Sequence, residues 1–162
     1  MKIICIISPG SGYGKTTLIE KIIREMVKRG LRVCAIKHSS HHIEEDYGKD
    51  SWRFRRAGAM ASALISNNGI IYVSNPNFVF SIISSINPDF IICEGFKESN
   101  YPKLVIIKDV NEFQMLKEIS NIIGVVYDGV VYDGKITNMK IPILKNVEEI
   151  VEFLISVVKE IV

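Results

Sequence analysis

Short apolar runs alternate with amphipathic segments of helical length along this chain. The run from Ile3 to Ile7 is followed by a segment from about Lys15 to Arg29, whose apolar residues recur every three or four positions. A helix-ending glycine, Gly30, precedes a second apolar run from Arg32 to Lys37. A strand, a helix and a second strand in this order predict a βαβ unit with parallel strands and a right-handed crossover.

The rest of the chain predicts further strands and helices of similar length. We expect strands at 61–66, 70–73, 90–93, 103–107, 122–127 and 141–144, and helices starting at 50–51, 75–76, 112 and 147. The dipeptide Asn68-Gly69 indicates a two-residue hairpin turn. We therefore predict an α/β protein with a mostly parallel central sheet, helices on both faces and a hairpin or edge extension, in one domain over 1–162.

Composition and charge narrow the class of protein. The chain has 162 residues, of which 48% are hydrophobic, so it is long and apolar enough for one globular core. A net charge of +2 is too small to indicate nucleic-acid binding. No apolar run reaches membrane-spanning length, and an apolar strand so near residue 1 leads us to expect no signal peptide. Cys5, Cys34 and Cys93 have no disulfide or zinc spacing, so we expect core thiols in the cytoplasm.

The glycine-rich stretch from Ser8 to Thr17 has the spacing and context of a phosphate-binding loop, between a strand and a helix. Its alternate glycines let successive N–H groups point at an anion, and the helix dipole favours a phosphate there. Lys15 would reach the β- and γ-phosphates, and Thr16 would join a Mg²⁺ shell. Pro9 replaces the usual first glycine, and we expect the loop to survive. The predicted nucleotide-binding residues are Gly10, Ser11, Gly12, Tyr13, Gly14, Lys15, Thr16 and Thr17.

Carboxylates at the ends of apolar runs are the next candidates. Glu94 ends the 90–93 run, as a Walker-B carboxylate does, and would hold Mg²⁺ or orient a water, unless it is an exposed turn residue. Asp46 competes for a metal or water-positioning role, whereas Asp50 has a helix start to cap. Asp128 follows the 122–127 run, where a carboxylate could accept from guanine N–H groups or simply form a turn with Gly129.

Two clusters of basic side chains lie between the second strand and the hairpin. The histidines are His38, His41 and His42, which suit a transition metal but lack paired ligand spacing, so a polar loop lining the phosphates is the alternative. The arginines are Arg53, Arg55 and Arg56, which suit phosphate or a partner's anionic group, or else form a solvated helix face.

Four segments of this chain together resemble the molybdopterin-guanine dinucleotide biosynthesis protein B family. They are PGSGYGKTTLIEKII, IKHSSHHIEEDYGKDSWRFRRAGA, DFIICEGFK and YPKLVII, with a weaker match at PILKNVEEIVEFL. The second segment is the most specific, because few nucleotide-binding proteins combine its histidines with Gly-Lys-Asp-Ser and Arg-x-x-Gly-Ala.

The resemblance implies a P-loop NTPase fold of the SIMIBI class that binds GTP and Mg²⁺, usually as a homodimer. It implies an adaptor for the guanylyltransferase that joins GMP to molybdopterin, with molybdopterin a further candidate ligand and at most slow GTP hydrolysis. The candidate catalytic residues are Lys15, Glu94 and Asp46. The candidate contacts to the partner or the pterin phosphate are His38, His41, His42, Lys49, Asp50, Arg53 and Arg56.

Three alternative functions remain open at this point. A small-molecule kinase or ATP-dependent ligase uses the same phosphate loop. A nickel-type metallochaperone GTPase is motivated by the histidines. An interaction module would bind nucleotide without hydrolysing it. The base-reading residue is unsettled, because the chain has no Asn-Lys-x-Asp motif.

Overall fold

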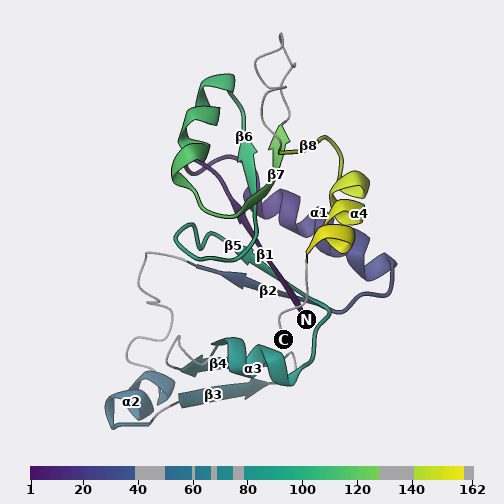
Figure 1. Cartoon of the computed structure of the whole chain (residues 1–162). Helices are drawn as coiled ribbons and strands as arrows, with labels where there is room; N and C mark the ends of the chain where they lie inside the picture. Colours follow the sequence, from purple (N-terminus) through teal and green to yellow (C-terminus); the bar gives the residue numbers. More distant parts are fainter. Residues whose placement is uncertain (39–49, 60, 67–68, 75–78, 128–140, 159–162) are drawn as a thin grey trace. The chain divides into compact units, whose positions relative to one another are not determined.

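The computed structural model describes residues 1–38, 50–59, 61–66, 69–74, 79–127 and 141–158 of the chain (Figure 1). The chain divides into two compact units. The first consists of Met1–His38 and Pro88–Val162, and the second of Ser39–Asn87. The single domain over 1–162 stays a prediction.

A six-stranded sheet forms the centre of the first unit, in the order β2-β5-β1-β6-β7-β8. Its strands are β1 (Lys2–Ile7), β2 (Val33–Lys37), β5 (Phe90–Glu94), β6 (Lys103–Ile107), β7 (Ile122–Tyr127) and β8 (Ile143–Leu144). All neighbouring strands pair in parallel, as the sequence predicted. The carboxyl ends therefore meet at one edge, where the register aligns Glu94 with both Ile6 and Lys37.

Two helices pack against one face of this sheet, α1 (Lys15–Lys28) and α4 (Val147–Val157). Alternate residues of the strands bury their side chains against the apolar stripes of both helices. This core includes Ile4, Ile6, Ile22, Met26, Leu104, Ile106, Ile150 and Leu154. The helix-ending role predicted for Gly30 is confirmed, because it has a φ of +78° just after Arg29, the C-cap of α1.

The opposite face of the sheet is covered beside β7 by η2 (Val110–Glu118), the green helix that follows β6 in Figure 1. The Phe113 ring of η2 lies edge-on to the Tyr127 ring, with centroids 6.4 Å apart. The helix predicted over 112–119 is present, but it begins earlier and is a 3₁₀-helix. Asp109 and Glu112 form a capping box that begins a 3₁₀-helix two residues earlier.

Two more sequence predictions need correction. The strand predicted over 141–144 is shorter in the structure. It is β8, because parallel pairing with β7 extends over Ile143 and Leu144 alone. In the second unit, Gly69 lies in a strand rather than in the turn, because it pairs with Ser66 and so leaves residues 67–68 as the connection.

The second unit contains a helix, a β-hairpin and a further helix, as the sequence predicted. These are α2 (Asp50–Arg56), the antiparallel strands β3 (Ala61–Ser66) and β4 (Gly69–Ser74), and α3 (Val79–Ser85). The predicted start of the last helix at 75–76 lies outside the described residues. Across the described parts of the chain, none of the helices combines the length and apolar character needed to cross a bilayer.

Candidate phosphate and magnesium site

The glycine-rich loop joins the end of β1 to the first residue of α1. Gly12 and Gly14 both have a φ of +74°, a left-handed conformation that other residues adopt only with strain. Gly14 is the N-cap of α1, and within the described structure no side chain caps this helix. The first-turn N–H groups and the positive end of the helix dipole are thus available to an anion.

Lys15 lies back across the loop. Its Nζ donates to Ser8 Oγ at 2.6 Å and to the Gly10 carbonyl oxygen at 2.8 Å. Phosphate oxygens are stronger acceptors for an ammonium group than either of these partners. These two Lys15 bonds form with Pro9 at the position where the usual motif has glycine.

Glu94 lies beside the loop, at the carboxyl end of β5. Its Oε2 accepts a hydrogen bond of 2.9 Å from the Thr16 hydroxyl, and its Oε1 lies 3.4 Å from Lys37 Nζ. The Glu94 side chain is only 14% exposed, whereas that of Lys37 is 64% exposed. A hydroxyl and a carboxylate side by side are hard oxygen donors of the kind that Mg²⁺ prefers. The residues present therefore fit a magnesium ion.

The backbone around Glu94 holds its side chain at this edge. The Gly95 N–H donates to the Ile6 carbonyl at 3.0 Å, and the His38 N–H donates to the Glu94 carbonyl at 3.0 Å. Gly95 has a φ of +92°, and an added Cβ there would lie 3.6 Å from that of His38. The His38 ring lies 5.2 Å from the Phe96 ring. His38 is thus a neighbour of the predicted Walker-B carboxylate.

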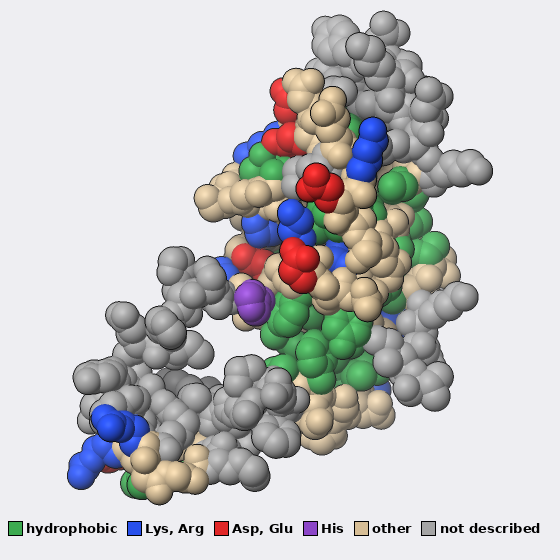
Figure 2. All heavy atoms as spheres, turned by 60° about the vertical axis from the view of Figure 1, so that its left-hand side comes forward, with side chains coloured by type: hydrophobic (Ala, Val, Ile, Leu, Met, Phe, Trp, Pro, Cys, Tyr) green, Lys and Arg blue, Asp and Glu red, His purple; other side chains and the backbone are tan. Residues whose placement is uncertain are grey.

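Lysine and arginine side chains lie among aspartates and glutamates on the face of the first unit seen in Figure 2. This mixture agrees with the Lys37–Glu94 ion pair at the strand ends. Nearby charges of opposite sign offset one another, so the described residues of this face do not form a broad electrostatic field of one sign.

Several predicted site residues cannot be placed in this site. Asp46, His41, His42, Lys49 and Asp128 lie outside the described residues. The others belong to α2 in the second unit, where an exposed Arg53 lies 3.7 Å from Asp50 and Arg56 is also exposed. In the parts of the chain that the structure describes, no three His, Cys, Asp or Glu side chains gather as a metal site.

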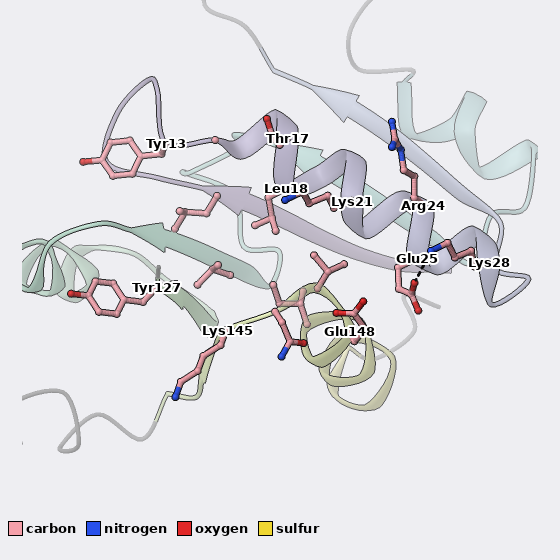
Figure 3. Close-up of a pocket in the computed structure, with 16 residues that line it drawn as sticks. Tyr13, Thr17, Leu18, Lys21, Arg24, Glu25, Lys28, Tyr127, Lys145 and Glu148 are labelled. Carbon is pink, nitrogen blue, oxygen red and sulfur yellow. Dashed lines mark ion pairs between the residues drawn. The ribbon is translucent and has the colours of Figure 1, made fainter. Parts of the chain in front are cut away.

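A groove of about 660 Å³ opens beside the loop, between α1 and the start of α4. Figure 3 shows Tyr13 and Tyr127 at one end of the groove, and Glu25 with Lys28 at the other. Apolar side chains of Leu18, Ile106, Val126 and Ile150 are among its lining residues. Its size is in the range of small-molecule sites.

Sequence reasoning missed two residues that contact the loop. Lys108 Nζ donates to the Gly12 carbonyl at 2.9 Å, and the Tyr13 hydroxyl donates to the Glu112 carboxylate. This second bond lowers the pKa of Glu112 and raises that of Tyr13. Lys37, at the end of its strand, forms an ion pair with Glu94 instead. The Asp-x-x-Glu spacing at Asp109 indicates a helix start, but no local pattern indicates a contact with the loop.

A parallel sheet whose first strand leads through a glycine-rich loop and Lys-Thr into a helix defines a protein with the P-loop NTPase fold. The solved structure of Bacillus subtilis MobB has this fold, with a TM-score of 0.72 at 22% identity over 98% of this chain and 99% of that one. The sequence profile of the Molybdopterin guanine dinucleotide synthesis protein B family matches residues 3–128. The chain belongs to this family.

Two relatives carry adapter names. The chain is 37% identical over 103 residues to the molybdopterin-guanine dinucleotide biosynthesis adapter protein of Haemophilus influenzae. This aligned region covers 59% of the chain and 58% of the relative. The chain is 30% identical over 135 residues to the putative adapter protein of Methanocaldococcus jannaschii. This aligned region covers 71% of the chain and 56% of the relative. The chain thus spans less than two thirds of either relative. Family membership does not favour the kinase, ligase or metallochaperone alternatives.

Proposed function

We propose that this protein is a GTP- and Mg²⁺-binding adaptor in molybdopterin guanine dinucleotide synthesis. It assists the guanylyltransferase that joins GMP from GTP to molybdopterin. Family membership supports the pathway. The single observation that carries the nucleotide part is the Thr16–Glu94 hydrogen bond of 2.9 Å beside the Lys15 loop, because it joins a metal-binding pair to a phosphate-binding loop.

The phosphates are bound by the N–H groups of the loop, the amino end of α1 and the Lys15 ammonium. Lys15 exchanges its bonds to Ser8 and Gly10 for phosphate oxygens, which neutralises the β- and γ-phosphates. Thr16 and Glu94 hold Mg²⁺, with Asp46 a further candidate, and the ion supplies positive charge to the phosphates. Glu94 is also the candidate for orienting a water. Any GTP hydrolysis is slow, as the family resemblance implies.

The nucleoside lies on the side of the loop away from Glu94, at the Tyr13 end of the groove. Thr17 and Leu18 line the groove one turn into α1, next to the phosphate loop, and Tyr127 lies at the same end (Figure 3). Asp128 follows Tyr127 directly in the sequence. This order supports Asp128 as the reader of the guanine N–H groups.

The partner and the assembly are inferred from the family. The guanylyltransferase is the partner, with a homodimer as the active form. His38 and the 41–56 segment are the candidate contacts to that enzyme or to the pterin phosphate. Free thiols at Cys5, Cys34 and Cys93 support a reducing compartment, the cytoplasm.

Competition binding tests the nucleotide assignment directly. A fluorescent GTP analogue is bound in the presence of Mg²⁺ and displaced with unlabelled GTP or ATP. We expect GTP to displace it at a much lower concentration than ATP, and Lys15→Ala to abolish binding. Lys117→Ala, at an exposed lysine of η2 that does not line the groove, is the matched control and keeps wild-type affinity. Equal displacement by ATP would exclude the guanine assignment.

Copurification tests the adaptor assignment separately. The tagged full chain is mixed with the molybdenum cofactor guanylyltransferase, with GTP and Mg²⁺ present. We expect a stable complex, and faster formation of the guanine dinucleotide when the adaptor is added. An absence of both effects would contradict the adaptor role while leaving nucleotide binding intact.

A further inference from the structure

We propose that Lys108, Tyr13 and Glu112 form a brace that holds the phosphate loop in its anion-binding form before the nucleotide arrives. This inference rests on the proposed nucleotide binding and identifies three positioning residues for it. They lie on two segments, the loop itself and the stretch from the end of β6 into the start of η2. Neither Lys108 nor Glu112 belongs to the glycine-rich motif.

The main-chain part of the brace acts on the peptide bond between Gly12 and Tyr13. Lys108 follows the last residue of β6, and β6 lies next to β1 in the sheet, so its side chain reaches the loop. Its Nζ donates to the Gly12 carbonyl at 2.9 Å. In a trans peptide the C=O and the following N–H point in opposite directions. By holding the Gly12 carbonyl outward, Lys108 directs the Tyr13 N–H toward the opposite side.

The side-chain part of the brace acts on Tyr13. The Tyr13 hydroxyl donates to Glu112 Oε1, and the Lys108 ammonium lies 5.1 Å from the centre of the Tyr13 ring. The other Glu112 oxygen accepts from the backbone N–H of Lys108 at 2.8 Å and of Asp109 at 3.3 Å. Glu112 is therefore fixed by the capping box that starts η2, and it passes this rigidity to the loop.

The three contacts matter because Gly12 has no packing of its own among the described residues. Gly12 has a φ of +74° and no neighbour within 4 Å of where a Cβ would be, so its own packing does not select this conformation. Glycine also has more backbone freedom to lose on ordering than any other residue. A brace that orders Gly12 in the free protein lowers the conformational entropy that nucleotide binding must remove.

Binding of two ligands to single variants tests the brace. GTP and inorganic tripolyphosphate are each titrated against a fluorescent GDP analogue on the full chain. We expect Lys108→Met to weaken both ligands by the same factor, about tenfold, which is the size for loss of one hydrogen bond from a charged donor. Tyr13→Phe weakens both in the same direction. Lys108→Arg restores most of the affinity, because its guanidinium also donates to a carbonyl.

Controls separate the brace from other roles. Lys117→Met, an exposed lysine at the end of the same η2 helix, keeps wild-type affinity, and thermal melting shows that each variant is folded. Unchanged affinity in folded Lys108→Met and Tyr13→Phe overturns the brace alone. A loss confined to GTP, with tripolyphosphate unaffected, also overturns it, because Lys108 would then contact the nucleoside. A wild-type protein that binds neither ligand overturns both this inference and the proposed function.

Discussion

Replacement of Glu94 by Gln separates the metal-binding role of this residue from its structural role. The amide has the same shape as the carboxylate, and its oxygen still accepts the Thr16 hydroxyl that lies 2.9 Å from Glu94. Two interactions of the negative charge are lost. One is the ion pair with Lys37 at 3.4 Å, and the other is the attraction to the proposed Mg²⁺ ion.

The two losses differ in size. Because the Lys37 side chain is 64% exposed, water and salt screen this ion pair, and its contribution to folding is at most about 1 kcal/mol. The free energy of unfolding of Glu94→Gln is therefore within about 1 kcal/mol of wild type. A metal site is more sensitive, since loss of even an outer-shell carboxylate typically lowers metal affinity by about 10–100-fold.

The assay compares the affinity for GTP in excess EDTA with that in saturating Mg²⁺. In the wild-type protein we expect Mg²⁺ to strengthen GTP binding. In Glu94→Gln the Mg²⁺ titration midpoint moves to about 10–100-fold higher concentration, while affinity in EDTA stays the same or rises. Glu98→Gln, an exposed glutamate in the loop after β5, is the control. If Glu94→Gln has the same Mg²⁺ midpoint as wild type, the magnesium role of Glu94 is refuted.

Three further variants test the loop, the core and an exposed ion pair. Gly14 has a φ of +74°, so Gly14→Ala places an alanine in the left-handed conformation, which costs about 1–2 kcal/mol, and we expect weaker tripolyphosphate binding. Gly10→Ala is the comparison, because Gly10 has no positive φ and its added Cβ would lie 3.8 Å from the nearest atom, so we expect a smaller loss of binding. Gly124→Ala places a Cβ 2.8 Å from Leu104 Cδ2, so urea unfolding finds a loss of about 1–3 kcal/mol with unchanged GTP affinity. The side-chain hydrogen bond from Arg32 lowers the pKa of the Asp89 carboxyl. The contribution of this carboxylate to folding stability is therefore complete above the ordinary carboxyl pKa of about 4, and it is lost as the pH falls through the lowered pKa of Asp89. In Asp89→Asn we therefore expect the midpoint of urea unfolding to fall less at acid pH than in the wild type. An equal fall in both proteins would contradict the stabilising role of the Asp89 carboxylate.

Local sequence patterns predicted most elements of the first unit. Alternating apolar stripes and a glycine stop located α1, and a continuous apolar run located β5, because both patterns depend on neighbours in the chain. The errors arose where the pairing between two strands set the ends of a strand. β8 is short because β7 pairs with only Ile143 and Leu144, and Gly69 is in a strand because its partner is Ser66.

The candidate site was predictable in part for the same reason. A phosphate loop is a contiguous motif, and Glu94 was located by the end of its own apolar strand. The contact between Glu94 and Thr16 joins residues 78 positions apart. We expected Glu94 to lie near the loop because parallel strands end at the same edge of the sheet. The Lys37 pair with Glu94 depends on β2 lying next to β5, an order that neither strand encodes alone.

The sequence by itself determined the class of this protein. The strand, glycine-rich loop, Lys-Thr and helix predict a phosphate-binding loop through their order in the chain alone, and the four segments together indicated the family. Only the tertiary structure decided which residues support that loop. Lys108 and Gly12 are 96 positions apart and meet because β6 lies beside β1, and Glu112 reaches Tyr13 because a capping box starts η2 there. Such contacts depend on the packing of the whole sheet, whereas a motif depends only on its immediate neighbours in the chain.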